Sequence, residues 1–310
     1  MKKKWLWCLL ALIAVVCIVS MCFRHPDLSQ MKVSTGKLEI YNDFPSKYIK
    51  PRAVRVWLPD GYEKMEKCSV LYMHDGQMLF DDSVTWNHQE WQVDEVIGRL
   101  IADGKVPPCI VVAIDNSEED RINEYFPCKT YLQLPADVYN QVNVKDFTAD
   151  NYLKFLVEEL KPFIDSHYKT FTDREHTAIM GSSMGGLISL YAICEYPQVY
   201  GAAGCMSTHL SLMLPDALGR PKVDCEPWAE AFCSYVKKNL PSMDDHYIYM
   251  DRGTVELDGS YAPYQDKIDA MFRSHGWDAN HYDSRVYEGH EHNETCWAKR
   301  LDQPLQFLIK

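Results

Sequence analysis

The most informative stretch of the chain is Thr177–Leu187, TAIMGSSMGGL, in which Gly-x-Ser-x-Gly joins a short apolar run to a helical pattern. A serine on a sharp strand-to-helix turn projects its hydroxyl above the sheet, and flanking glycines remove the side chains that would collide there. A Gly-rich loop with exposed serines can carry the same letters. The strand predicted over 177–180 and the helix predicted over 185–195 favour a nucleophile at Ser183.

Outward from this turn, strand-like and helix-like segments alternate along the chain, which predicts an α/β fold with a mostly parallel sheet flanked by helices. The predicted strands are 53–58, 69–73, 110–114, 177–180, 201–206, 247–250 and 285–287, and the predicted helices are 151–168, 185–195 and 264–275. Pro162 is expected to kink or divide the first helix. Because residues 208–245 contain many prolines, we expect an irregular insertion before the catalytic acid that walls the pocket.

The composition is that of an ordinary globular protein, with 310 residues of which 46% are hydrophobic. Lys and Arg total 32 against 44 Asp and Glu, so the formal net charge is −12. A negative chain without a basic stripe does not attract phosphate backbones, and we expect no nucleic-acid partner.

The N-terminus has the pattern of a targeting segment. Three lysines, Lys2–Lys4, precede an apolar run over 5–23, which predicts that residues 1–23 are a signal peptide or a membrane or lipoprotein anchor. Cys22 is the candidate lipid attachment site, although Met21 stands where a small residue is usual. We therefore expect an exported protein, periplasmic or associated with the cell envelope, with cleavage, lipidation at Cys22 and retention as an anchor all open.

A nucleophilic serine requires a base and an acid that orients the base, and in hydrolases of this topology the chain order is Ser, acid, His. The acid candidates that follow strand 247–250 are Asp251, Glu256 and Asp258, and the base candidates that follow strand 285–287 are His290 and His292. Spacing alone leaves both choices open.

Acyl transfer also needs hydrogen-bond donors for the oxyanion. The backbone amide of Met184, directly after the nucleophile, supplies one, and either Gly76 or Gln77 in the loop after strand 69–73 supplies the other. Neither His74, Asp75, His88 nor the late histidines form a ligand pair such as HxxxH, so no metal and no other cofactor is expected.

Together, five motifs resemble the esterase family of the α/β-hydrolase superfamily, which includes enterochelin, feruloyl and acetyl xylan esterases, S-formylglutathione hydrolases and mycolyltransferases. The motifs are HDGQMLFDD (74–82), RINEYFP (121–127), AIMGSSMGG (178–186), DRGTVE (251–256) and EGHEHNETCW (288–297). The resemblance covers one domain, residues 38–310. It implies Ser183 as nucleophile, Glu256 as acid and His292 as base. Relatives often carry Asp at the position of Glu256, and in this chain an aspartate, Asp258, follows two residues later.

The resemblance implies a serine carboxylesterase that acts through a Ser-His-Glu triad and an acyl-enzyme, with acetyl or feruloyl groups on carbohydrate as the expected substrates. The alternatives are a siderophore esterase of the enterochelin type and an acyltransferase. We expect His209 and Trp228, both within residues 208–245, to line the substrate pocket. The expected partners are a small-molecule or carbohydrate ester and, through the N-terminus, a membrane.

Overall fold

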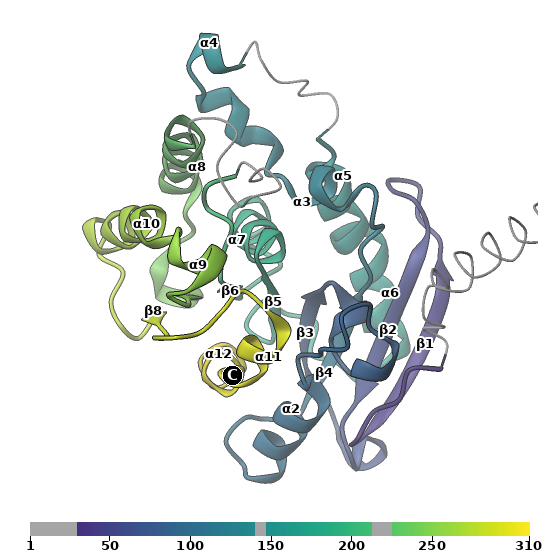
Figure 1. The fold of residues 1–310 in the computed structure, drawn as a ribbon. Coiled ribbons are helices and arrows are strands. Elements are labelled where there is room, and N and C mark those ends of the chain that lie inside the picture. Colours follow the sequence, from purple (N-terminus) through teal and green to yellow (C-terminus); the bar gives the residue numbers. More distant parts are fainter. Residues whose placement is uncertain (1–29, 140–146, 213–224) are drawn as a thin grey trace, which may run out of the picture.

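The computed structural model describes residues 30–139, 147–212 and 225–310 (Figure 1). The predicted targeting segment, including Cys22, lies outside these residues. Within the described part of the chain, no helix is both long enough and apolar enough to cross a membrane.

Eight strands form one sheet in the order β1-β2-β4-β3-β5-β6-β7-β8. They are β1 (Lys37–Phe44), β2 (Arg52–Leu58), β3 (Ser69–His74), β4 (Cys109–Ile114), β5 (Thr177–Ser182), β6 (Ala202–Met206), β7 (Tyr247–Arg252) and β8 (Tyr282–Val286). The six strands β4, β3, β5, β6, β7 and β8 run parallel to one another, and β1 and β2 are antiparallel to their neighbours. This sheet confirms the predicted fold class. Strand β1 is not evident from the sequence, because most side chains of this edge strand are exposed or half-buried and it shows no apolar run.

Helices cover both faces of the sheet (Figure 1). The longer ones are α2 (Val93–Ala102), α7 (Met184–Glu195), α8 (Glu226–Asn239) and α10 (Ala262–Ser274), and the shorter ones are α3 (Arg121–Tyr125), α4 (Ala136–Tyr139), α5 (Ala149–Lys154), α6 (Lys161–His167), α9 (Glu256–Gly259), α11 (Glu294–Ala298) and α12 (Asp302–Leu308). In one hydrophobic core, α2 and α12 pack against the face of the sheet that carries Leu71 and Val111. In the other core, the helices α5, α6, α7 and α8 pack against the face that carries Tyr72 and Val112. The alternation of side chains along each buried strand thus supplies both cores.

The segment predicted as one helix over 151–168 is helical throughout but changes its pitch. Between α5 and α6 lies η7 (Phe155–Leu160), a π-helical stretch, and Pro162 occupies the first turn of α6. A proline inside a helix removes one hydrogen bond of the i→i−4 ladder and crowds the preceding turn, and the change of pitch lies directly before Pro162, so the segment divides into pieces without ending.

The segment over 208–245 is more regular than the sequence suggested. Residues 213–224 lie outside the described part, but α8 occupies Glu226–Asn239. Pro227 is one of the prolines on which the expected irregularity rests. Because it stands in the first turn of α8, where its fixed φ suits a helix, it begins the helix instead.

Candidate active site

Ser183 lies on the turn between β5 and α7 in a backbone conformation that few residues adopt, with φ 57° and ψ −121°. Its amide donates to the Met206 carbonyl on β6 at 3.0 Å, which fixes the turn to the neighbouring strand. A Cβ atom at Gly181 would lie 2.8 Å from the backbone of Gly185, so the turn closes only with glycine at this position. A strained turn of this kind holds a side chain at the carboxyl edge of the sheet, as the Gly-x-Ser-x-Gly pattern predicted.

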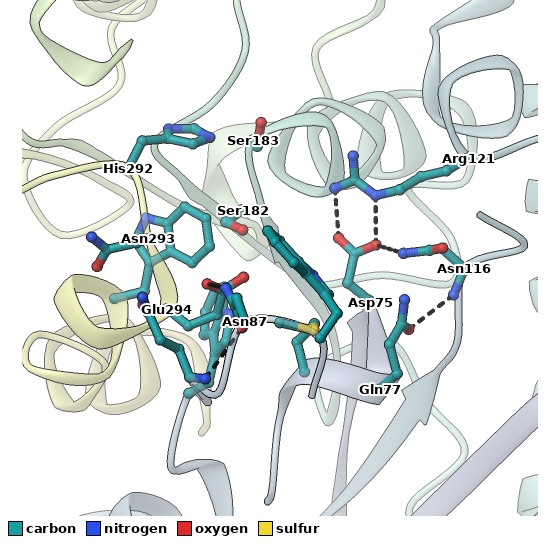
Figure 2. Close-up of a pocket in the computed structure, with 15 residues that line it drawn as sticks. Asp75, Gln77, Asn87, Asn116, Arg121, Ser182, Ser183, His292, Asn293 and Glu294 are labelled. Carbon is teal, nitrogen blue, oxygen red and sulfur yellow. Dashed lines mark hydrogen bonds and ion pairs between the residues drawn. The ribbon is translucent and has the colours of Figure 1, made fainter. Parts of the chain in front are cut away.

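His292 lies in the loop between β8 and α11, and Figure 2 shows its imidazole directed toward Ser183. Its Nδ1 is 2.6 Å from Oδ1 of Asp258, a carboxylate with no exposed side-chain surface. The ring also packs edge-to-face against Trp297, with centroids 5.1 Å apart. The structure therefore brings His292 and Asp258 together beside Ser183.

The acid next to His292 is Asp258, which corrects the expectation for Glu256. Glu256 is exposed at the start of α9, where its φ of 52° turns the chain, whereas Asp258, two residues later, faces the interior. The second carboxylate oxygen of Asp258 accepts from the Gly253 amide and the Ser207 hydroxyl, both at 2.6 Å. Burial opposes the ionisation of Asp258, but hydrogen bonds from the imidazole, the hydroxyl and the amide hold its pKa below the usual value.

A buried ion pair lies behind the acid. The Arg300 guanidinium donates to Asp251 at 2.9 Å and to the Ser207 hydroxyl at 2.8 Å. Asp251, one of the acid candidates, is thus engaged with Arg300, and Ser207 connects this pair to Asp258. Arg300 and Ser207 are not evident from the sequence, because a lone arginine in a turn between two helices and a serine after a strand have no diagnostic spacing.

His290, the other candidate base, lies against Arg300 instead of Asp258. Its Nδ1 is 3.2 Å from Arg300 Nη1, and burial together with this cation lowers the pKa of His290. Its backbone carbonyl accepts from the amides of Thr254 and Val255, at 3.1 and 3.3 Å. This residue therefore connects the loop that carries His292 to the turn that carries Asp258.

The loop after β3 lies opposite His292 across the cavity. Gln77 lines the cavity, whereas Gly76 is buried against β4, where an added Cβ would lie 2.8 Å from the backbone of Ala113. Of the two predicted donors in this loop, Gln77 is thus the one beside the cavity. The Met184 amide stands at the first position of α7, directly after Ser183.

An ion pair holds this loop in place (Figure 2). Arg121 Nε and Nη2 donate to the two carboxylate oxygens of Asp75 at 2.7 and 2.8 Å, and Asn116 adds a hydrogen bond of 2.6 Å. Burial opposes ionisation, but the Arg121 guanidinium outweighs it and holds the pKa of Asp75 below the usual value. A two-pronged pair of this kind fixes geometry as well as charge.

A cavity of about 510 Å³ opens over these residues. Besides Ser183 and His292, it is lined by Asp75, Gln77, Met78, Trp86, Asn87, Gln89, Trp91, Asn116, Arg121, Ser182, Asn293, Glu294 and Trp297. Trp86 is 77% exposed, the largest exposure among the large hydrophobic side chains of the described residues. The Asn87 amide donates to Glu294 at 2.8 Å, and burial raises the pKa of this carboxyl.

The two residues predicted to line the pocket, His209 and Trp228, are not among the described residues that line the cavity. Trp228 lies on the core face of α8 and packs edge-to-face against Phe126, with centroids 5.6 Å apart. His209 is 2% exposed, and its Nδ1 is 2.8 Å from the Tyr261 hydroxyl. Both expectations rested on position within 208–245, and helix formation and burial direct these side chains elsewhere.

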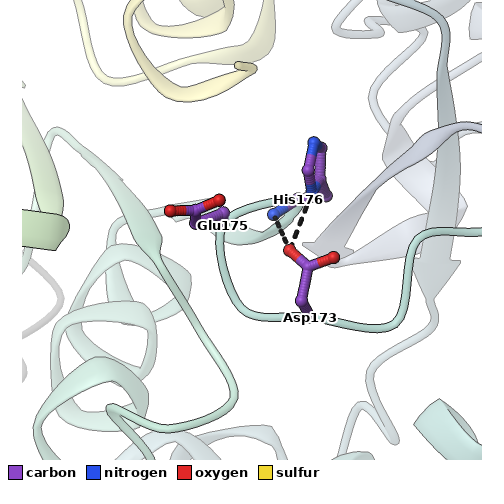
Figure 3. A group of neighbouring side chains, drawn as sticks. All are labelled: Asp173, Glu175 and His176. Carbon is purple, nitrogen blue, oxygen red and sulfur yellow. Dashed lines mark hydrogen bonds and ion pairs between the residues drawn. The ribbon is translucent and has the colours of Figure 1, made fainter.

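Among the described residues, one group has the composition of a metal site. Asp173, Glu175 and His176 offer ligand atoms within 4.8 Å of one another (Figure 3). His176 is already paired with Asp173 at 2.7 Å, and the two acids are exposed. The group lies on the loop that precedes β5, at the opposite end of that strand from Ser183, so it takes no part in the candidate active site.

Comparisons with known proteins assign the chain to a family. The family model described as "Putative esterase" matches residues 47–308. An endo-1,4-beta-xylanase/feruloyl esterase of Xylanibacter ruminicola is 29% identical over 296 residues, which cover 93% of this chain and 32% of that protein. An iron(III) salmochelin esterase of Escherichia coli O6:H1 is 21% identical over 252 residues, covering 81% of this chain and 53% of that protein.

A solved structure of a ferulic acid esterase superimposes with a TM-score of 0.60 at 22% identity, covering 88% of this chain and 98% of that one. This likeness shows that the fold is of the α/β-hydrolase type. The chain spans 32% to 61% of the length of the curated relatives it matches. Since the family model covers most of the sequence, the chain belongs to the esterase family.

Proposed function

We propose that this protein is a serine carboxylesterase that removes acyl groups, such as acetyl or feruloyl, from carbohydrate. The observation that carries the proposal is the buried Asp258, 2.6 Å from His292 Nδ1, with the imidazole facing Ser183 at the bottom of an open cavity. The triad in this proposal is Ser183, His292 and Asp258.

The reaction would proceed in two halves. Ser183 Oγ attacks the ester carbonyl while His292 Nε2 takes the hydroxyl proton, and Asp258 stabilises the imidazolium through Nδ1–H. The amides of Met184 and Gln77 face the developing oxyanion. The intermediate collapses as His292 returns the proton to the departing alcohol. Water then attacks the acyl-enzyme while the same imidazole takes its proton, and His292 returns that proton to Ser183 Oγ as the acid leaves.

The lining of the cavity supports carbohydrate as the alcohol. An exposed indole, Trp86, offers a flat apolar surface for the C–H face of a sugar ring, and Asn87, Gln89 and Glu294 offer hydrogen-bonding groups for hydroxyls. One relative is named a xylanase/feruloyl esterase. Another relative is named an iron(III) salmochelin esterase, so a siderophore ester is the alternative substrate that the test must include.

The test is hydrolysis of an ester panel by the purified protein, with Ser183→Ala as control. The panel contains p-nitrophenyl acetate, methyl ferulate, feruloyl-arabinose, an acetylated xylo-oligosaccharide and an enterochelin-type ester. We expect hydrolysis of the sugar esters that depends on Ser183. Equal turnover by Ser183→Ala would contradict the mechanism, preference for the enterochelin-type ester would assign siderophore release, and product on an added acceptor sugar would assign acyl transfer.

We also propose that residues 1–23 direct export, and that the protein reaches the periplasm or the cell envelope. The support is the sequence pattern of three lysines followed by an apolar run that ends near Cys22. Cell fractionation and the mass of the mature protein test this proposal. Incorporation of labelled palmitate that Cys22→Ala abolishes would identify a lipoprotein, and an intact N-terminus in the cytosol would contradict export.

A further inference from the structure

The carboxylate oxygen of Asp258 that is not bonded to His292 contacts a serine at the end of a strand. Ser207 directly follows β6 and is fully buried, and its hydroxyl donates to Asp258 Oδ2 at 2.6 Å. The Gly253 amide donates to the same oxygen at 2.6 Å, and the other oxygen, Oδ1, lies 2.6 Å from His292 Nδ1. One oxygen of the acid is therefore held by the protein frame, and the other is bonded to the imidazole.

Two further donors fix the direction of the Ser207 hydroxyl. Arg300 Nη2 donates to Ser207 Oγ at 2.8 Å, and Trp297 Nε1 donates to it at 3.0 Å. A hydroxyl has one proton and two acceptor positions, whereas guanidinium and indole N–H groups can only donate. Because both acceptor positions are filled and Ser207 has no solvent-exposed surface, its proton has one destination, which is Asp258 Oδ2.

The backbone of Ser207 is held as firmly as its side chain. Its amide donates to the Asp251 carbonyl at 2.9 Å and to Asp251 Oδ1 at 3.1 Å. Its φ of 41° lies in the left-handed region, which is uncommon for a residue other than glycine. A strained conformation persists only where the surrounding contacts over-determine it. Here those contacts keep the hydroxyl within hydrogen-bond distance of Asp258.

We propose that Ser207 is a positioning residue for Asp258, an inference that rests on the proposed function. Its hydroxyl keeps Asp258 ionised and Oδ1 directed at His292, because a proton on Oδ2 would meet the hydrogens of both Ser207 and Gly253. Trp297 connects this arrangement to the base, since its N–H fixes the hydroxyl while its ring packs edge-to-face against His292. The acid and the imidazole that it orients are thus held by one common set of contacts.

The role matters most in the step in which His292 carries the proton of Ser183. The imidazolium is then stabilised by an ionised carboxylate at Nδ1. Without the Ser207 hydroxyl, Asp258 Oδ2 keeps only the Gly253 amide as a close donor, and the carboxylate can rotate away from the imidazole. A carboxylate with one donor fewer also binds a proton more tightly, so the pair of His292 and Asp258 should become protonated at a higher pH.

The test uses two variants that both lack the hydroxyl but differ in backbone strain. We expect Ser207→Ala and Ser207→Gly each to lower kcat for p-nitrophenyl acetate by about tenfold with KM within about twofold, because orientation of the base acts on the chemical step. In both variants the acid limb of the plot of kcat against pH should move to higher pH. Since glycine suits a φ of 41°, Ser207→Gly should melt at a higher temperature than Ser207→Ala and still be as slow.

Tyr249→Phe is the matched control. The Tyr249 hydroxyl belongs to the same buried network but donates to Asp251, at 3.1 Å, instead of to Asp258. This variant should keep kcat within about twofold and leave the acid limb in place. Circular dichroism melting identifies any variant that does not fold, and Ser207→Gly carries the comparison if Ser207→Ala is lost.

Three outcomes would overturn the inference and leave the proposed function intact. The first is an unchanged kcat and an unmoved acid limb in both Ser207 variants. The second is full activity in Ser207→Gly alone, which would assign the effect to the backbone. The third is a loss in Tyr249→Phe as large as in Ser207→Ala, which would assign it to packing of the network. Failure of the unmodified protein to hydrolyse any ester would remove the proposed function and the inference together.

Discussion

Behind His292 the polar side chains are buried and paired with one another, whereas in front of it they face an open cavity. Asp258, Asp251 and Arg300 are each at most 1% exposed, and all three bond Ser207: its hydroxyl donates to Asp258 and accepts from Arg300, and its backbone amide donates to Asp251. On the other side, Trp86 is largely exposed and Glu294 has a single amide partner in Asn87. From this difference we expect substitution of the buried, paired side chains to lower both activity and stability. Substitution of the side chains that line the cavity should change substrate binding with little effect on folding.

The largest expected effect comes from a comparison of substitutions at the two acid candidates, the buried Asp258 and the exposed Glu256. Asp258→Asn should lower kcat by about 10⁴-fold, because the amide no longer holds the proton on His292 Nδ1 or stabilises the imidazolium. Glu256→Gln, the matched control on the exposed first turn of α9, should remain within about twofold of the unmodified protein. Steady-state hydrolysis of p-nitrophenyl acetate measures both. Loss of activity in Glu256→Gln alone would reinstate the expectation from sequence.

Removal of the buried cation tests the same side through stability. Arg300→Met should lower the free energy of unfolding by about 3–5 kcal/mol, because Asp251 is left buried with an uncompensated charge. Urea denaturation followed by circular dichroism gives this value. The double variant Arg300→Met/Asp251→Asn should recover much of the loss, and Lys299→Met, at the exposed neighbour, should change little. An unaltered midpoint for Arg300→Met would show that Asp251 is protonated in the folded protein.

The open side should respond in binding instead of stability. Trp86→Ala should raise KM for feruloyl-arabinose by about tenfold through lost stacking, with KM for methyl ferulate, which has no sugar, within about twofold. Trp86→Phe keeps an aromatic surface and should lie between. The melting temperature should not move, since the indole is mostly exposed. Equal changes for both esters would place Trp86 against the acyl group.

The smallest expected effect concerns the carboxyl of Glu90, which is adjacent in sequence to residues that line the cavity. Glu90 lies between the cavity residues Gln89 and Trp91, and burial followed by repulsion from Glu95 and Asp94 raises the pKa of Glu90 to about 8. A carboxyl whose pKa is raised on folding loses stability as the pH rises from its unfolded value toward 8. Glu90→Gln should therefore raise the free energy of unfolding by about 1 kcal/mol at pH 8 and by much less at pH 5. Urea titrations at both pH values measure the difference, and an equal gain at both would refute it.

The sequence predicted what depends on local pattern. Ser183 needs only its flanking glycines, a strand and a helix, and His292 is in a loop after a strand, as expected. The acid was not predictable from its motif, because Glu256 and Asp258 are two residues apart and the direction of each side chain depends on a turn with positive φ. Arg300 was missed since its importance comes from contacts between distant segments. Trp228 was misplaced because proline content does not reveal that α8 forms and which face it buries.

The carbonyl of His290 has a consequence for the way the protein loses activity. Because it accepts the amides of Thr254 and Val255, the loop of the base and the turn of the acid are joined by main-chain bonds that no side-chain substitution removes. Such a unit opens cooperatively, as a local unfolding event smaller than global denaturation. Amide hydrogens in 253–261 and 288–293 should then exchange with solvent at one common rate, and inactivation on warming should follow that rate before the sheet itself melts.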